Sequence, residues 1–272
     1  MIAAPDTIMK LEAAALTDTG QQRPLNEDTV FQHTIQTDAG YYAGLYMVCD
    51  GLGGLSAGDE ASRLAAQTLI TELGPVLIKQ KRAQRRNLTS PTTATLYRWL
   101  ESAVAKANSN IVNYIKRLPL VTGKAGTTVT MALVYGYLAL IVNVGDSRTY
   151  GWRRGRLTQI THDHSWAAEM VEYGMLEPEM QSQHRWRNIL TRALGIEKKV
   201  SPDIFEWELQ PGDKLLLCSD GLWQAFPDEQ ELASRLGREA AAEDICWDLV
   251  AEANKRDGSD NISVVLVSAE PA

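Results

Sequence analysis

Apolar residues recur along the first half of the chain with spacings that predict one strand followed by two helices. Residues 45–48 form a short apolar run that ends in a Cys-Asp-Gly step at 49–51, which is typical of a strand entering a tight turn. From Ala57 the apolar positions return every three or four residues, and a Gly-Pro step at 74–75 marks the expected end of this helix. Over residues 95–117 apolar side chains again trace one face, so a second helix is expected there.

The second half of the chain carries mostly strand signals. Residues 126–145 are rich in β-branched and aromatic side chains, and a turn near 135–137 divides them into two antiparallel strands. The run at 215–218 is too continuously apolar to alternate, so both faces of that strand are expected to be buried. An apolar stripe over 242–253 predicts a helix, and 264–267 predicts a final buried strand. These patterns indicate an α+β fold in which helices cover mostly antiparallel sheets.

Two segments depart from these patterns. Residues 79–94 contain five basic residues, no acidic residue and no apolar face, so we expect an exposed excursion there. An acidic partner or nucleic acid is one candidate for the basic run at 79–86, but a solvated helix end or loop is the preferred interpretation. Residues 165–187 are polar, helical in part and rich in Trp and Met.

Composition narrows the class of protein. The chain holds 34 acidic and 27 basic side chains, so its formal net charge is −7, which disfavours nucleic acid and anionic membrane as partners. The N-terminus lacks the continuous apolar core of a signal peptide, and the longest apolar stretch, 131–145, is shorter than the ~20 residues of a membrane-spanning helix. Cys49, Cys218 and Cys246 form no CxxC pair, which argues against a disulfide framework or a thiolate zinc site. We therefore expect a cytoplasmic protein.

Acidic residues recur where the predicted strands begin or end. Because strand ends in a compact sheet lie close together, several of these carboxylates are expected to converge on one rim. Two unscreened carboxylates about 5 Å apart would repel each other by about 3 kcal/mol at an effective dielectric constant of ~20. Cations must neutralise such a cluster, and oxygen ligands select hard ions such as Mg²⁺ or Mn²⁺. The acids are Glu27, Asp28, Asp50, Asp146, Asp220 and Asp260.

Glycines next to two of these acids support the same interpretation. Gly51 and Gly221 directly follow Asp50 and Asp220, allow a tight turn and leave the neighbouring carbonyl open to an ion. A single Asp-Gly step after a strand is more often only a turn. Two such steps, together with the other acids at strand ends, favour a metal site.

Eight short motifs, in one order and spacing, point to a known family. They are residues 23–28 (RPLNED), 50–54 (DGLGG), 125–128 (AGTT), 144–148 (VGDSR), 161–165 (THDHS), 190–195 (LTRALG), 218–222 (CSDGL) and 260–261 (DN). The chain resembles the metal-dependent Ser/Thr protein phosphatases of the PP2C (PPM) type, in their compact bacterial form. The resemblance implies a central β-sandwich of two mostly antiparallel sheets flanked by helices, in four αββα layers. It also implies a flap near 165–187 and a single domain over 1–272, because both ends supply motifs.

The resemblance further implies a metal centre with two or three Mn²⁺ or Mg²⁺ ions. Asp50 would bridge two ions, and the Gly51 carbonyl would bind one of them. Asp220 and Asp260 would hold the first ion, and Glu27 would act on the second. These roles belong to the family and are carried over to the matching positions of this chain.

Further roles carried over concern catalysis and substrate. Asp28 would orient coordinated water, and Asp146 with Asp220 would form a weaker third site. Arg23 is implied as a clamp for the substrate phosphate, since a guanidinium fork matches two phosphate oxygens. Its alternative role is a surface ion pair with a nearby acid. Animal relatives carry a histidine two residues after the bridging aspartate, whereas this chain has Leu52, so the general acid stays open, with coordinated water as one candidate.

The implied activity is hydrolysis of phosphoserine and phosphothreonine on proteins by a metal-activated water, without a protein nucleophile. The implied partners are phosphorylated proteins, including a Ser/Thr kinase or its substrates, without nucleic acid or membrane, and we expect a monomer. Two alternatives stay open: a catalytically silent phosphoprotein-binding module on the same fold, and a two-metal hydrolase of small phosphoesters. Retention of Arg23 and of the acids counts against the silent module.

Two other features have competing interpretations. His162-Asp163-His164 superficially resembles a zinc pair, but no third or fourth soft ligand accompanies it, so metal ligation there is disfavoured. The large apolar residues of the flap either pack it down or offer phosphoproteins an adaptable surface, and packing is the preferred interpretation. They are Trp166, Met170, Met175, Met180 and Trp186.

Overall fold

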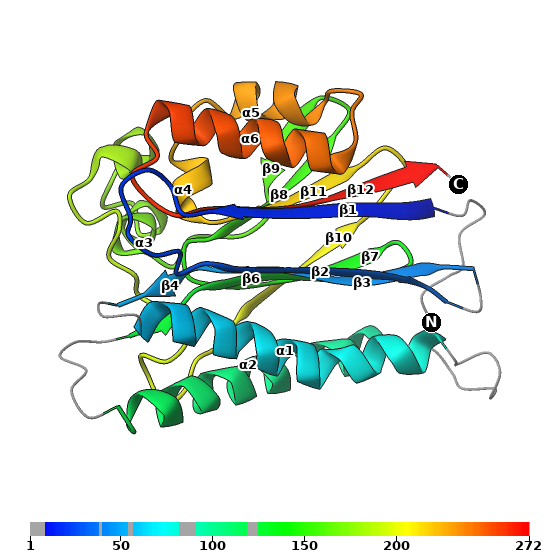
Figure 1. Ribbon diagram of the computed structural model, residues 1–272, viewed down its shortest axis with the longest axis horizontal. Coiled ribbons are helices and arrows are strands. Elements are labelled where there is room, and N and C mark those ends of the chain that lie inside the picture. Colours follow the sequence, from blue (N-terminus) through cyan, green and yellow to red (C-terminus); the bar gives the residue numbers. More distant parts are fainter. Residues whose placement is uncertain (1–8, 38–39, 54–56, 82–90, 119–124, 272) are drawn as a thin grey trace.

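The computed structural model in Figure 1 describes residues 9–37, 40–53, 57–81, 91–118 and 125–271. Its main strands form two five-stranded sheets in which neighbouring strands run antiparallel. The first sheet contains, in order, β1 (Met9–Asp18), β12 (Ile262–Pro271), β11 (Lys214–Cys218), β8 (Arg148–Arg153) and β9 (Arg156–Gln159). The second contains β10 (Asp203–Glu208), β7 (Leu138–Val144), β6 (Val129–Tyr135), β3 (Tyr42–Cys49) and β2 (Thr29–Gln36). A short pair, β4 (Gly51–Leu52) and β5 (Gly126–Thr127), lies at the end of β3.

Helices cover the outer faces of the two sheets, as Figure 1 shows. The second sheet is covered by α1 (Ala57–Lys81) and α2 (Thr93–Ile115). The first sheet is covered by α4 (Asp220–Trp223), α5 (Glu229–Leu236) and α6 (Ala242–Arg256). Between β9 and β10 the chain forms α3 (Trp166–Glu172) and the 3₁₀ helix η2 (Pro178–Gln183). The predicted αββα sandwich is therefore confirmed.

Successive side chains of a buried strand alternate between the core between the two sheets and the core under the helices. In β11, Leu215 and Leu217 pack into the core between the sheets, while Leu216 and Cys218 pack under the helices of the first sheet. Successive side chains of a strand point to opposite faces, so a strand in the middle of four layers must be apolar on both. The prediction that both faces of 215–218 are buried is confirmed.

The first helix differs from the sequence prediction at its end. α1 passes through Pro75 and continues to Lys81 instead of stopping at the Gly-Pro step. A proline inside a helix costs ~3 kcal/mol because it removes one hydrogen bond and crowds the preceding turn. Leu73, Val76 and Leu77 are buried around it, and each contributes about 1.5–3 kcal/mol by leaving water. Burial therefore outweighs the local signal.

This correction also shortens the predicted excursion at 79–94. Its first residues belong to α1, and its last two begin α2, whose N-cap Thr92 accepts a hydrogen bond from the amide of Thr95. Residues 82–90 lie outside the described residues. The second helix is confirmed within two residues of the predicted bounds, with Leu96, Leu100 and Ile111 on its buried face.

Other elements agree with the sequence or were missed by it. The hairpin of β6 and β7 turns at the predicted place, with Tyr135 opposite Leu138. The last helix and strand are α6 and β12, and both are longer than predicted. The sequence analysis did not predict β1, β10, α4 or α5. β1 pairs with β12 along its whole length, from Met9 opposite Pro271 to Asp18 opposite Ile262, so the first and last strands are neighbours.

The structure also describes the cysteines and the lengths of the helices. Cys49, Cys218 and Cys246 are buried free thiols. Within the described ranges, no helix combines the length and the apolar character needed to cross a membrane.

Candidate metal centre

The acids at the strand ends converge on one cleft. Its volume is about 720 Å³, and it opens where β3, β7 and β11 end and β12 begins. Seven of the eight predicted site residues line it: Arg23, Glu27, Asp50, Gly51, Asp146, Asp220 and Asp260. Leu52, Thr128, Asn188, Leu190 and Asn261 contribute to the same walls. The expectation that strand ends bring these carboxylates together is therefore correct, although the ligand role of each stays a prediction.

Asp28, the eighth predicted residue, is buried and has no place in the cleft wall. Neither of its carboxylate oxygens accepts a hydrogen bond from the described residues. The hydroxyls of Ser263 and Ser219 act on Asp28 and oppose the rise of its pKa, but neither reaches hydrogen-bond geometry with it. The Ser263 hydroxyl pairs with Thr17 at 2.7 Å, and that of Ser219 accepts from the Ser263 amide. Burial, with the charges of Asp220 and Asp260, raises the pKa of Asp28 to about 7. Buried carboxylates normally have a hydrogen-bond or cationic partner, so an unpaired Asp28 indicates that a cation binds nearby.

The other acids of the cleft carry the same electrostatic signature. Burial first, and then the charge of Asp260, raises the pKa of Asp220 to about 6. The pKa of Asp50 lies well above its usual range because of burial and the charges of Asp28 and Asp220, and burial with the charge of Asp220 does the same to Asp146. The set repels itself, so the site favours binding of cations.

The donor chemistry fits hard divalent ions. All the ionisable ligands offered are carboxylates, and the cleft walls add backbone carbonyls, which suit Mg²⁺ or Mn²⁺. Across the described residues, no three His, Cys, Asp or Glu side chains are already gathered in the arrangement that holds an ion. The structure thus shows convergence of charge on one cleft, and the metal assignments rest on that charge and on the unpaired Asp28.

Arg23 lies at the rim of the cleft. Its Nη2 atom is 2.7 Å from Oδ2 of Asp260, and about half of its side chain is exposed. The ion pair that the sequence analysis left as an alternative is present. Because Asp260 itself lines the cleft, the pair also holds the guanidinium beside the predicted metal site. Among the described residues that line this cleft, Arg23 alone has a basic side chain.

Tight backbone packing fixes the turn after β3. The Gly51 amide donates to the Glu27 carbonyl at 3.1 Å, and the Asp50 carbonyl accepts from the Thr128 amide at 2.8 Å. A Cβ atom on Gly51 would lie 2.4 Å from the carbonyl oxygen of Gly58 and 2.5 Å from that of Glu27. Only glycine fits there, so the glycine after Asp50 serves the close approach of three segments.

Asn261 joins the two ends of the chain at the cleft. Its Nδ2 donates to the carbonyls of Thr19 and Leu25 at 2.9 and 3.0 Å, and its Oδ1 accepts from the Glu27 amide at 2.8 Å. The loop that carries Arg23 and Glu27 is therefore tied to the residue that follows Asp260. The sequence analysis quoted this asparagine in a motif but gave it no role; an amide directly after a site acid was the available signal.

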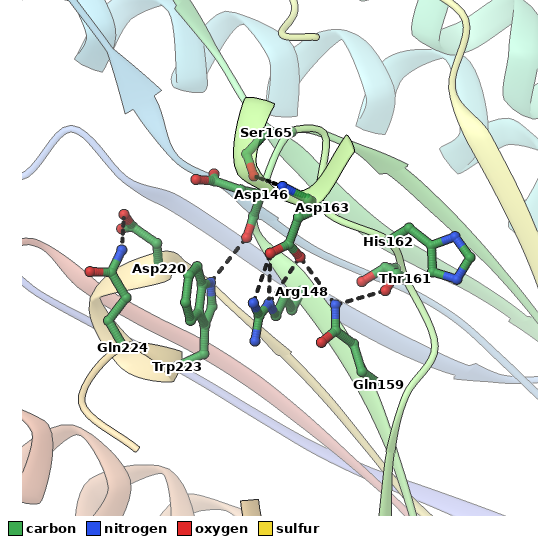
Figure 2. Close-up of polar contacts among 12 residues, drawn as sticks. Asp146, Arg148, Gln159, Thr161, His162, Asp163, Ser165, Asp220, Trp223 and Gln224 are labelled. Atoms are coloured by element: carbon green, nitrogen blue, oxygen red, sulfur yellow. Dashed lines mark hydrogen bonds and ion pairs between the residues drawn. The ribbon is translucent and has the colours of Figure 1, made fainter. Parts of the chain in front are cut away.

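The short helix α4 holds two of the cleft acids, as Figure 2 shows. Gln224 Nε2 donates to Asp220 at 2.9 Å, and the indole Nε1 of Trp223 donates to the backbone carbonyl of Asp146 at 3.0 Å. The sequence analysis missed both residues. Gln224 follows Asp220 by four residues and so lies on the same helical face, a consequence of helical spacing that an expected helix there would have revealed.

The His-Asp-His stretch has a structural role in this fold. Asp163 forms an ion pair with Arg148, and the Gly145 amide donates to His164 Nδ1 at 3.1 Å. The opposite ring nitrogen of His164 contacts Asp203 at 3.1 Å, and the ring of His162 packs edge-on against Phe205. Burial lowers the pKa of His164, which agrees with an uncharged ring that accepts at Nδ1. These contacts use both histidines without a metal.

The predicted flap is only partly packed down. The rings of Trp166 and Trp186 meet edge to face with centroids 4.1 Å apart, as preferred for packing. Met175 and Met180 are 72% and 52% exposed, so the prediction that they pack the flap is wrong. They lie in the turn after α3 and in η2, which present them to solvent.

Comparisons with known proteins agree with this arrangement. A family model described as Protein phosphatase 2C matches residues 21–244. The serine/threonine phosphatase stp of Listeria welshimeri is 34% identical over 94% of this chain and 95% of the relative. The solved serine/threonine phosphatase of S. agalactiae is 30% identical, with a TM-score of 0.80, and the match covers 96% of this chain and 100% of that one. The catalytic domain of serine threonine protein phosphatase PstP, solved in complex with 2 manganese ions, is 30% identical with a TM-score of 0.77, over 96% of this chain and 99% of that one.

The αββα sandwich and its acid-lined cleft define a metal-dependent protein phosphatase. This chain belongs to the protein phosphatase 2C family. The family, the serine/threonine phosphatase activity and the fold predicted from the eight sequence motifs are thereby confirmed.

Proposed function

We propose that the cleft binds two divalent cations, Mn²⁺ or Mg²⁺, and that the chain uses them to hydrolyse phosphoserine and phosphothreonine on proteins. The observation that carries the proposal is the set of buried carboxyls without cationic partners, above all Asp28, whose oxygens accept no hydrogen bond from the described residues. The manganese-bound PstP structure supports the ion type and the number two. We further propose that Asp146 and Asp220 together hold a third ion.

Five of the predicted site residues have a proposed task in that reaction. When bound, paired dications acidify a water that attacks phosphorus and offset the charge of the phosphoryl oxygens. Asp50 would lie between the ions, and Asp220 and Asp260 would hold one of them. Asp28 would accept a hydrogen bond from water and so orient it, while Arg23 would leave Asp260 to bind phosphate oxygens through its guanidinium fork.

The leaving alkoxide needs a proton that the cleft side chains do not readily supply. Leu52 lines the cleft at the position where animal relatives carry a histidine. Among the described lining residues there is no histidine, lysine or cysteine. Water is therefore the proposed proton donor.

An assay with a phosphothreonine peptide tests the proposal. We expect turnover with Mn²⁺ or Mg²⁺, its loss in EDTA, and its recovery when excess ion is restored. Asp260→Asn should lower turnover strongly, whereas Asp257→Asn, three residues earlier and exposed outside the cleft, should leave it unchanged. Absence of turnover on the peptide and on para-nitrophenyl phosphate would favour the silent binding module, and a preference for nucleotides would favour the hydrolase of small phosphoesters.

The biological setting is also proposed. The proposed partners are phosphorylated proteins, among them a Ser/Thr kinase or its substrates. We do not propose nucleic acid or a membrane as a partner. The net charge of −7 and the free buried cysteines support an acidic cytoplasmic protein. The molar mass measured by light scattering during size-exclusion chromatography would test whether the protein is a monomer, as we expect.

A further inference from the structure

Arg148 lies two residues after Asp146, with 15% of its side chain exposed, and has three different contacts. Its guanidinium forms a fork with Asp163, with Nε–Oδ1 and Nη2–Oδ2 distances of 2.9 and 2.7 Å. Its Nη1 donates to the Tyr150 hydroxyl at 2.9 Å, and its Cζ lies 3.7 Å from the ring centroid of Trp223. Gln159 reinforces the pair by donating to Asp163 at 3.1 Å. The arginine is thus clamped between the loop before α3 and the short helix α4 (Figure 2).

Trp223 passes this restraint to the cleft acids. Its indole Nε1 donates to the Asp146 carbonyl, and it stands on the same helical turn as Asp220. A guanidinium stacked on an indole is attracted by the negative face of the ring, which fixes the ring plane. Fixing that plane fixes the direction of the indole N–H, and with it the backbone position of Asp146 relative to α4.

The loop before α3 restrains Asp146 from the other side. His164 exchanges two hydrogen bonds with Gly145, at 2.9 Å to its carbonyl and 3.1 Å from its amide. Gly145 has a φ of +112°, and a Cβ there would lie 2.5 Å from Cγ2 of Thr128. The backbone entering Asp146 is therefore held by the same loop whose Asp163 holds Arg148.

We propose that Arg148 is a positioning residue for Asp146 and Asp220: through Trp223 it sets the spacing at which these two carboxylates share a divalent ion. The inference rests on the proposed function. Arg148 does not line the metal cleft and forms no ion pair with either carboxylate. Its charge does reach Asp146, but the charge of its partner Asp163 acts on Asp146 in the opposite direction. The positioning effect therefore runs through the indole and the two backbone segments. Partners of this kind, one layer behind the metal ligands, typically change metal affinity 10- to 100-fold when removed.

The other end of the same strand provides a matched control. Arg153, the last residue of β8, forms a fork with buried Asp213 at 2.8 and 2.6 Å, and its Cζ lies 5.1 Å from the ring centroid of Trp207. The chemistry matches that of Arg148, but the indole Nε1 of Trp207 donates to no described residue, and neither Arg153 nor Trp207 lines the metal cleft. A purely structural role predicts the same behaviour for both arginines, whereas positioning predicts a difference.

The experiment measures Mn²⁺ binding by titration calorimetry on metal-stripped protein, well below the melting temperature. For Arg148→Met we expect the Kd of the weakest-bound Mn²⁺ to rise about 10- to 100-fold, and turnover to need correspondingly more Mn²⁺. For Arg153→Met we expect every Kd to stay within about twofold of the unmodified protein. Both variants should lower the melting temperature, since each leaves a buried carboxylate without its arginine partner.

Trp223→Phe tests the same link without disturbing the ion pair. It keeps an aromatic ring under Arg148 and removes the N–H that holds the Asp146 carbonyl, so the weakest Kd should rise as in Arg148→Met. The double variant should add little to either single change, because both interrupt one path. This variant also keeps the test decisive if Arg148→Met does not fold.

Equal Mn²⁺ affinities in the Arg148, Trp223 and Arg153 variants would overturn the inference and leave the proposed function intact. An unmodified protein that binds no Mn²⁺ would overturn both. A loss confined to the Arg148 and Trp223 variants supports the inference.

Discussion

Two groups of buried acids in this protein have the same exposure and opposite surroundings. Asp28 and Asp146, in or beside the cleft, are 8% and 7% exposed, and Asp163 and Asp213 are 8% and 2% exposed. The second pair forms ion pairs with arginines, whereas no ion pair is found for either acid of the first pair among the described residues. Arg148 acts on Asp146 only through its charge, and Arg23 lies at the rim. Burial alone therefore does not distinguish a functional acid from a structural one.

The pKa values show what the missing partner changes. Burial alone would raise the pKa of Asp203, yet hydrogen bonds from His164 and Arg192 bring it below its usual value. In the cleft the same desolvation is reinforced by neighbouring carboxylates, so the pKa of Asp220 rises to about 6. An acid that the fold leaves without a counter-charge is an acid that an external cation can use.

Removal of a cleft acid should produce the largest effect on activity. Asp220→Asn should lower turnover of a phosphothreonine peptide by orders of magnitude, because it removes a ligand proposed for two ions, while the protein stays folded. Asp213→Asn, which removes a buried acid that is paired with an arginine, should leave turnover unchanged below its melting temperature. Steady-state kinetics at saturating Mn²⁺, with circular dichroism as the check on folding, measures both. An unchanged rate for Asp220→Asn would refute the site assignment.

The stability of the metal-free protein should depend on pH in the direction opposite to that of an ordinary salt-bridged aspartate. The pKa values of Asp28 and Asp220 in the folded protein are about 7 and about 6, above the ~3.9 of an unfolded chain. Between about pH 4 and pH 7 the folded state therefore binds more protons than the unfolded state. The free energy of unfolding should then fall as the pH rises from about 4 to about 7. Urea unfolding in EDTA across this range measures the slope.

Mn²⁺ should reverse this dependence. Ions bind the deprotonated carboxylates, so the protein with Mn²⁺ should gain stability, by about 2.7 kcal/mol at a hundredfold excess over Kd, and most at the higher pH. A slope that is the same with and without Mn²⁺ would show that the cleft acids are not the groups that titrate.

The comparison also explains what could be read from the sequence. The cleft was predictable because its acids sit beside turns at the ends of strongly apolar strands, a local pattern that topology then gathers. Asp163 and Arg148 were both quoted in motifs, but their pairing across 15 residues depends on the register of β8 with its neighbours. α4 was missed because four residues give no periodicity, although it carries Trp223. β1 was missed because three successive alanines, residues 13–15, occupy its middle, and alanine is a weak strand former.

α1 shows the converse limit of sequence reasoning. A Gly-Pro step is a strong local signal for a helix end, and only the tertiary burial of Leu73, Val76 and Leu77 overrides it. Local signals fix elements where no larger energy opposes them.

Single substitutions should shift the stability of the two groups in opposite directions. In EDTA, Asp50→Asn should stabilise the protein, because it removes a charge that its neighbours repel. Asp213→Asn should destabilise it by about 2 kcal/mol, because it loses charged hydrogen bonds from Arg153 and one from the Gln210 amide. Denaturant midpoints at pH 7.5 give both signs. Destabilisation of similar size in both variants would remove the distinction between paired and unpaired acids.

Arg23 should give the smallest effect, because it belongs partly to each group. It is the cation at the rim of the cleft, it already pairs with Asp260, and half of its side chain is in water. Exposed ion pairs contribute little, so Arg23→Ala should barely change the melting temperature. If its main task is to hold substrate phosphate, KM for the phosphopeptide should rise about tenfold, which corresponds to ~1.4 kcal/mol of binding, with kcat nearly unchanged. A loss confined to kcat would instead mean that the guanidinium acts mainly on the transition state, and a change in Mn²⁺ affinity alone would reduce it to a partner of Asp260.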